Sequence, residues 1–128
     1  HVTLVSANTV SEIFESLLRV GEGDVVIGVS YPRYSSRTVR AMNFARDRGA
    51  TTVAITDSEA SPLAPISTYS LMARSEMASF VDSLVAPLSL VNALLVAVSQ
   101  RRNEDVERTF QTLEDIWEEY NVYEKVQE

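Results

Sequence analysis

The fold is decided by the stretch Gly23-Asp-Val-Val-Ile-Gly-Val-Ser-Tyr-Pro-Arg-Tyr-Ser-Ser-Arg-Thr38. Its apolar run at 25–29 is rich in β-branched residues and is bounded by turn residues, which is typical of a buried strand in a parallel sheet. A loop of hydroxyl side chains and one arginine follows. A helical pattern begins after this loop, and either Ser35 or Ser36 is well placed as its N-cap. The stretch therefore predicts a strand, a polar loop and a helix in succession.

The loop after this strand has the chemistry of an anion-binding site. The first N–H groups of a helix lack partners within the helix, and the helix dipole favours negative charge beside them. Serine hydroxyls and an arginine side chain add donors that suit phosphate. The alternative is an ordinary strand-to-helix turn with a serine cap and a solvated arginine. The candidate ligand-binding residues in the loop are Ser30, Tyr31, Arg33, Tyr34, Ser35 and Ser36.

This loop resembles the phosphate loop of the sugar isomerase (SIS) domain family, which carries Ser-x-Ser-Gly-x-Thr after its third strand. Ser30 matches the first serine of that motif and Ser35 matches the threonine. Pro32 and Arg33 stand where the second serine and the glycine would be. With Pro32 and Arg33, the loop sequence is more similar to that of RpiR-type transcription regulators, whose SIS domain often reads Ser-Phe-Pro-Arg-Tyr-Ser at this place. The resemblance runs from about Val2 to Gln100 and also includes Ala45, Gly49-Ala50, Ala54-Ile55-Thr56-Asp57 and Ser61-Pro62-Leu63-Ala64.

The resemblance implies a three-layer αβα sandwich with a parallel, flavodoxin-like sheet and a phosphorylated sugar as ligand. It leaves two functions open. The first is the effector-sensing domain of an RpiR-type regulator, without catalysis, and the second is an aldose–ketose phosphosugar isomerase. DNA would be contacted only through a helix-turn-helix domain that is absent from this sequence. Because the opening residues 2–5 resemble the second strand of the family, we expect the first strand–helix unit and part of the phosphate site to be missing.

Length, charge and composition limit the class of protein. The 128 residues suffice for one domain, 1–128, with its own core. A net charge of −7 disfavours direct binding to nucleic acid. The sequence has no cysteine, metal-ligand cluster, GxGxxG or Walker motif, so no metal or nucleotide cofactor is expected. The apolar stretch 80–98 is interrupted by Asp82, Pro87 and Asn92, so we expect a soluble, cytoplasmic protein without a membrane span.

The alternation of apolar runs and helical patterns predicts the order of elements in the first part of the chain. Strands are expected near 2–6, 24–29, 51–56 and 68–73, with helices at about 11–20 and 36–48 between them. Such alternation is typical of βαβ units around a parallel sheet that has helices on both faces. Because the family's first strand is expected to be missing, we predict that 2–6 pairs directly with 24–29 in a four-stranded sheet.

Two helices are predicted in the second part of the chain. The first, at about 78–100, is apolar nearly all round and should be buried, in the domain or at a subunit interface, with a kink or break at Pro87. The second, at about 104–123, carries an apolar seam that could pack on its own domain or on a second copy. These surfaces predict a dimer or higher oligomer. The seam consists of Val106, Phe110, Leu113, Trp117 and Tyr120.

Catalytic chemistry has little support in the sequence. Glu76 follows the last predicted strand and could hydrogen-bond sugar hydroxyls, or it could be a carboxylate that stabilises a helix N-terminus. Thr56 and Asp57 end another strand at the same edge, and the alternative role of Asp57 is to cap the following turn. An isomerase needs a pair of acid–base groups, whereas the one histidine is terminal and the one lysine, Lys125, lies in the tail. We therefore assign no catalytic residue.

Overall fold

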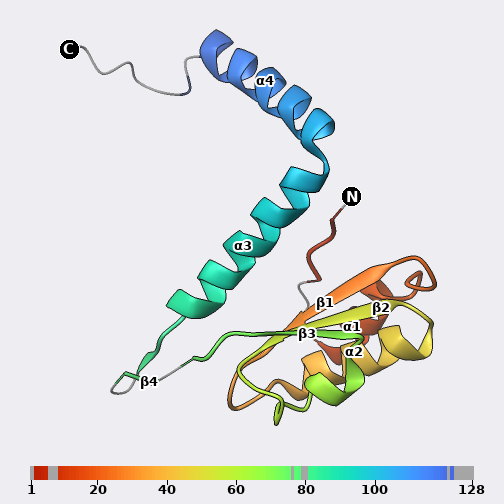
Figure 1. The fold of residues 1–128 in the computed structure, drawn as a ribbon. Helices are drawn as coiled ribbons and strands as arrows, with labels where there is room; N and C mark the ends of the chain where they lie inside the picture. The colour runs from red at the N-terminus through yellow and green to blue at the C-terminus, as the bar shows by residue number, and fades with distance from the viewer. Residues whose placement is uncertain (1, 6–8, 76, 79–80, 121, 123–128) are drawn as a thin grey trace. The chain divides into compact units, whose positions relative to one another are not determined.

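The computed structural model describes residues 2–5, 9–75, 77–78, 81–120 and 122. The contacts within the chain divide it into two units, residues 1–90 and 91–128. The expectation that residues 1–128 form a single domain stays a prediction. Helix α3 (Val85–Arg101) crosses the boundary, and α4 (Asn103–Glu119) lies in the second unit. The first unit contains α1 (Val10–Ser16), β1 (Val25–Val29), α2 (Ser36–Asp47), β2 (Thr51–Thr56), the 3-10 turn η1 (Ala64–Ile66), β3 (Tyr69–Met72), β4 (Met77–Ala78) and β5 (Val81–Asp82) (Figure 1).

The main sheet of the first unit is parallel, with the order β1-β2-β3. Val25 is in register with Thr51 of β2, and Val53 is in register with Tyr69 of β3. The expected α/β fold with a parallel sheet is therefore confirmed, together with the strands predicted at 24–29, 51–56 and 68–73. The helix predicted at 36–48 is also confirmed, and it ends before Gly49, whose φ of 84° suits the left-handed position after a helix.

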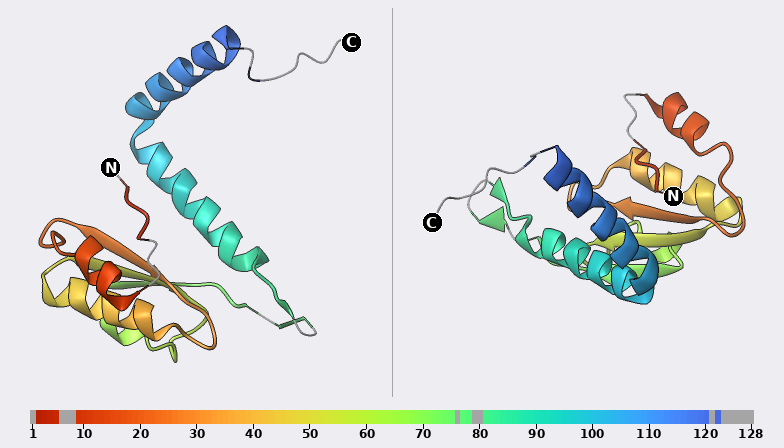
Figure 2. Two further views of the ribbon diagram at one scale, coloured as in Figure 1. Left: turned by 180° about the vertical axis from the view of Figure 1, so that it is seen from behind. Right: turned by 90° about the horizontal axis from the view of Figure 1, so that it is seen from above.

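The core of this unit forms where α2 packs on the sheet. Met42 of α2 is buried in a cluster with Ala54 and Leu63. The contact with β1 is so close that a Cβ atom added to Gly28 would lie 2.6 Å from Met42 Sδ. Helix α1 lies on the same side of the sheet as α2 (Figures 1 and 2). The two helices meet through the Phe14 and Phe44 rings, whose centroids are 5.2 Å apart in an edge-on arrangement.

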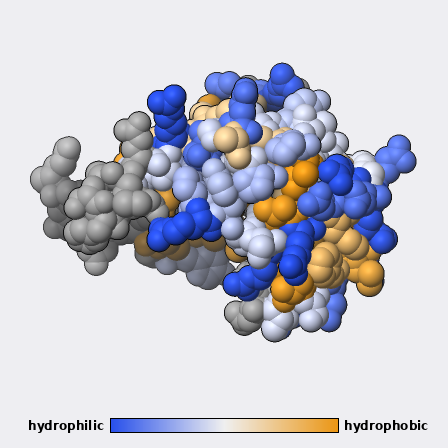
Figure 3. Space-filling view, turned by 90° about the horizontal axis from the view of Figure 1, so that it is seen from below, coloured by the Kyte–Doolittle hydropathy of each residue, from blue (hydrophilic) through white to orange (hydrophobic). Residues whose placement is uncertain are grey.

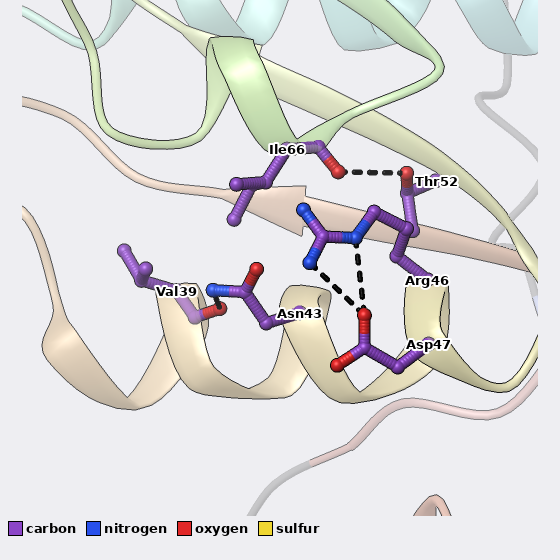
Figure 4. Close-up of polar contacts among 6 residues, drawn as sticks. All are labelled: Val39, Asn43, Arg46, Asp47, Thr52 and Ile66. Carbon is purple, nitrogen blue, oxygen red and sulfur yellow. Dashed lines mark hydrogen bonds and ion pairs between the residues drawn. The ribbon is translucent and has the colours of Figure 1, made fainter.

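Hydrogen bonds of Thr52 and Arg48 join the ends of helices and strands in this unit. The buried Thr52 hydroxyl donates to the Ile66 carbonyl at 3.2 Å, which fixes η1 against β2 (Figure 4). The Arg48 guanidinium donates to the carbonyls of Leu18 and Val20 at 3.1 Å. It also lies 5.4 Å from the centre of the Phe44 ring. The chain between α1 and β1 is therefore tied to the C-terminus of α2.

The face of the sheet opposite α2 carries exposed apolar side chains. Val25, Ile27, Val29 and Tyr69 are each at least half exposed. Because side chains alternate along a strand, these residues project away from the face that packs on Met42. Hydrophobic patches between hydrophilic residues are also visible on the face drawn in Figure 3. The unit thus buries a small core and leaves much apolar surface accessible.

The predicted pairing of residues 2–6 with β1 is wrong for the described part of that segment. Residues 2–5 form no strand, and among the described residues β1 pairs with β2 alone. Thr3–Val5 and β1 instead line an open groove of about 1090 Å³, together with Leu17 and Met42. The two segments thus lie on either side of a space that solvent can enter, and no backbone ladder joins them. The predicted helix at 11–20 is also too long, because α1 ends at Ser16 and Leu17 caps it.

The predicted helix at 78–100 begins later than expected. β4 and β5 form a short antiparallel pair before it, and α3 starts only at Val85. Pro87 therefore lies in the first turn, where proline is tolerated, and it does not break the helix. Leu88 and Leu95 are about 60% exposed in the single chain, so burial of α3 at a subunit interface stays a prediction. Among the described residues, no helix has the length and hydropathy required to span a membrane.

Gly28→Ala should destabilise the fold, because its new methyl group would meet Met42 and Leu63 in a filled core. We expect a loss of about 1–3 kcal/mol in the free energy of unfolding, measured by urea denaturation. Gly21→Ala is the matched control, since the nearest atom to its added Cβ is the Arg48 carbonyl oxygen at 3.7 Å, an ordinary contact. Equal losses in both variants would contradict the close packing of α2 on β1.

Candidate anion-binding site

Ser30 braces the loop at the carboxyl end of β1. Its side chain is only 7% exposed, and its hydroxyl oxygen accepts the Ser35 N–H at 3.0 Å. Its own N–H donates to the Ile55 carbonyl at 3.1 Å. Its carbonyl lies 2.8 Å from the Thr56 hydroxyl, which donates to it. Ser30 thus ties the loop to both α2 and β2, and its hydroxyl proton is still available as a donor.

Ser35 is the N-cap of α2, one of the two positions that the sequence indicated. Its hydroxyl oxygen accepts the Thr38 N–H at 3.3 Å, and its backbone is extended. The first turn of α2 contains no acidic residue, whereas Arg37 lies within it. Ser36, the first helical residue, is exposed. The helix N-terminus is therefore electropositive and open to solvent.

Arg33 adopts a left-handed backbone conformation, with a φ of 72°. It is the only residue other than glycine with positive φ among the described residues. This conformation is uncommon for a residue with a side chain and clusters at functional sites. Arg33 stands where the SIS motif has glycine, so the loop keeps a backbone suited to glycine and gains an exposed guanidinium.

Tyr34 joins the loop to the end of β2. Its hydroxyl donates to Asp57 Oδ1 at 2.7 Å, and this bond raises the pKa of Tyr34. Asp57 also accepts hydrogen bonds from the Ser58 hydroxyl at 3.1 Å and lies 3.2 Å from the Thr56 hydroxyl. Burial alone would raise the pKa of Asp57, but these hydrogen bonds, that of Tyr34 foremost, outweigh burial and lower it. Asp57 is therefore held as a carboxylate.

Tyr31 brings a second hydroxyl to the same edge of the sheet. Its oxygen is buried and has no hydrogen-bond partner among the described residues, as is also the case for the Ser75 hydroxyl. Burial and then the nearby Asp57 carboxylate raise the pKa of Tyr31, so this hydroxyl stays protonated at neutral pH. A buried hydroxyl without a partner is costly, and it marks a place where water or a ligand atom can bind.

The structure brings together the predicted loop residues but does not describe all of the predicted site. Glu76 lies outside the described residues, so its contact with sugar hydroxyls stays a prediction. The network of Thr56, Asp57 and Ser61 was not assigned from the sequence. The available signal was that Thr56 and Asp57 end a strand at the same sheet edge. Within the described residues, no group of three histidine, cysteine or acidic side chains could hold a metal ion.

Comparison with known protein families shows which family the chain belongs to. The family model of the SIS domain matches residues 2–97, which is most of the chain. The chain belongs to the SIS domain family. The loop at 30–36 lies within the matched residues, and its role as the phosphate loop of the domain stays a prediction.

Similar proteins include a transcriptional regulator and a transcription factor. An uncharacterised HTH-type transcriptional regulator of Caldanaerobacter subterraneus is 31% identical over 105 residues, 79% of this chain and 37% of the regulator. The sugar isomerase domain of the RpiR transcription factor from Sphaerobacter thermophilus is 30% identical, with a TM-score of 0.77 over 89% of this chain and 62% of that one. NanR of Vibrio vulnificus, complexed with ManNAc-6P, is 22% identical, with a TM-score of 0.68 over 86% and 44%, and shares the fold. The chain thus spans between about a third and two thirds of these proteins.

Ser35→Ala should destabilise this SIS domain, because the Thr38 N–H loses its side-chain acceptor at the start of α2. We expect about 1 kcal/mol less stability in thermal or urea unfolding. Ser36→Ala is the control, since Ser36 is exposed and lies one residue inside the helix. A larger loss for Ser36→Ala than for Ser35→Ala would show that the helix begins at another cap.

Proposed function

We propose that the loop at 30–36 and the N-terminus of α2 bind the phosphate of a phosphorylated sugar. The observation that carries this proposal is the acid-free first turn of α2, which lies between Arg33 and Arg40 and includes Arg37. A helix N-terminus with added arginine side chains and serine hydroxyls is well suited to a dianion. NanR, which shares this fold, is complexed with ManNAc-6P, and this supports the choice of a phosphorylated sugar.

We further propose that the chain is the effector-sensing SIS domain of an RpiR-type transcription regulator. Two of the similar proteins are a transcriptional regulator and a transcription factor by name, and both extend beyond the part that matches this chain. In this role the domain would act in the cytoplasm and would affect DNA only through a separate helix-turn-helix domain. The net charge of −7 is consistent with the absence of direct DNA contact.

We propose that the domain binds its ligand without chemical conversion. A general base works best when its pKa is near the operating pH. The pKa of Asp57 is instead lowered, and its oxygens accept several hydrogen bonds, so it is a weak base. Tyr31 and Tyr34 have raised pKa values and stay protonated. The described residues of the site therefore supply no acid–base pair for an aldose–ketose isomerisation.

Ligand binding can be tested by calorimetry with phosphorylated sugars such as ManNAc-6P, with inorganic phosphate and unphosphorylated N-acetylmannosamine as reference ligands. Arg33→Gly removes the guanidinium while suiting the left-handed backbone. We expect it to weaken binding of the best phosphorylated sugar at least about tenfold, or about 1.4 kcal/mol. The sugar should be recovered unchanged.

The matched control for this experiment is Arg46→Ala, which removes the same charge near the other end of α2, where Arg46 pairs with Asp47 at 2.9 Å. This control should bind like the wild type. If the three single variants Arg33→Gly, Ser30→Ala and Ser35→Ala all bind the ligand with wild-type affinity, the binding site lies elsewhere. Conversion of the sugar to an isomer would support the isomerase instead.

We also propose that the chain associates as a dimer or higher oligomer through α3 and α4. Leu88 and Leu95 of α3, Phe110 of α4 and Tyr120, which caps α4, are each more than half exposed. Light scattering should show at least a dimer at tens of micromolar, and Leu95→Glu with Phe110→Glu should shift it to a monomer. Asn92→Glu, an exposed polar position on α3, should have no such effect. A monomeric wild type would contradict the proposal.

A further inference from the structure

We propose that the hydrogen bond between Tyr34 and Asp57 holds the loop at 30–36 in its ligand-binding form. Both residues would then be positioning residues, which act on the ligand through the loop. This inference rests on the proposed function, because it names what fixes the same anion-binding site. Three observations support the inference: Asp57 is anchored by hydrogen bonds, the backbone is strained at Arg33, and the charge of Asp57 disfavours direct contact with a phosphate.

Asp57 is a rigid acceptor. Its Oδ1 accepts the Tyr34 hydroxyl at 2.7 Å, within the short range of hydrogen bonds to a charged oxygen. Its Oδ2 accepts the Ser58 hydroxyl at 3.1 Å. The Thr56 hydroxyl, 3.2 Å from Oδ1, is itself buried and 2.8 Å from Ser61 Oγ. Asp57 thus belongs to the fixed end of β2, and Tyr34 is attached to it from the loop.

The loop has two anchors, with the strained residue between them. Ser30 holds the Ser35 N–H on the side of α2. Tyr34 is held by Asp57 on the side of β2. Arg33, with its φ of 72°, lies directly before Tyr34 in the chain. A strained residue persists only when its surroundings over-determine its conformation. Without the Tyr34 bond, the loop can relax at Arg33 and change the position of its guanidinium.

The electrostatics of the pair favour this indirect role. Asp57 is a carboxylate with a lowered pKa, so a phosphate placed beside it would be repelled. Its oxygens already accept hydrogen bonds from the Tyr34 and Ser58 hydroxyls and do not need a ligand. If the charge of Asp57 were its main effect on binding, removal of the side chain would tighten binding. If Asp57 acts by holding Tyr34, removal would weaken binding.

These two outcomes can be separated by calorimetry on the full chain with ManNAc-6P and inorganic phosphate. We expect Tyr34→Phe and Asp57→Ala each to weaken binding about tenfold, and the double variant to weaken it little more than either single variant. Such non-additivity is what a shared hydrogen bond produces. Asp57→Asn retains an oxygen acceptor for Tyr34 and should restore most of the lost affinity. Tyr69→Phe, which removes an exposed hydroxyl on β3, is the control.

Amide hydrogen exchange gives a second measurement that requires no ligand. Tyr34→Phe should accelerate exchange of the Ser35 and Thr38 N–H groups several-fold while the amides of β2 exchange as in the wild type. Wild-type affinity and exchange in Tyr34→Phe, multiplicative effects in the double variant, or tighter binding by Asp57→Ala would each overturn the inference. If the wild type binds neither ManNAc-6P nor inorganic phosphate but the exchange rates change as expected, the proposed function fails. The role of the Tyr34–Asp57 pair in fixing the loop then stands.

Discussion

The close contact between α2 and β1 is the constraint on which the site depends. Gly28 has no side chain, and Met42 occupies the space that a Cβ atom would need. Because Met42 is buried against Ala54 and Leu63, α2 is fixed on the sheet near its middle. A helix fixed in this way has its N-terminus placed relative to the carboxyl ends of β1 and β2. The position of the electropositive first turn is therefore a consequence of apolar packing two turns further along the helix.

Hydroxyl groups carry that constraint from the core to the loop. Thr56 and Ser61 are almost completely buried, and each finds a partner within 2.8 Å. Buried hydroxyls are costly unless they are paired, so their hydrogen bonds select one arrangement of the strand ends. The Ser30 carbonyl accepts a hydrogen bond from Thr56 and is part of this network. The Ser30 hydroxyl oxygen accepts the N–H of Ser35, the N-cap of α2. The same hydrogen bonds that stabilise the fold thus determine where the donors of the loop point.

The sequence predicted those parts of the chain in which local pattern and packing agree. Helix α2 has a helical pattern, a serine cap and a glycine after its end, and it lies where it was expected. Strand β2 also lies where it was expected. Residues 2–5 read as a strand because they are apolar, yet pairing depends on a neighbour that the local sequence does not specify. The start of α3 was misplaced since apolar content does not distinguish the first helical turn at Val85 from the β4 and β5 pair. The Tyr34–Asp57 contact joins residues 23 apart, which no local pattern contains.

Arg33 shows why a departure from a family motif can preserve a site. A glycine at this position would give the left-handed backbone without strain, but it would contribute no charge. Arginine incurs a conformational cost at a φ of 72° and adds a permanent cation to a loop that leads into a helix N-terminus. The loop is held on either side of Arg33, by the Ser30 hydroxyl and by the bond from Tyr34 to Asp57. Under the proposed function, arginine at this position therefore exchanges some local stability for affinity toward the phosphate of a ligand.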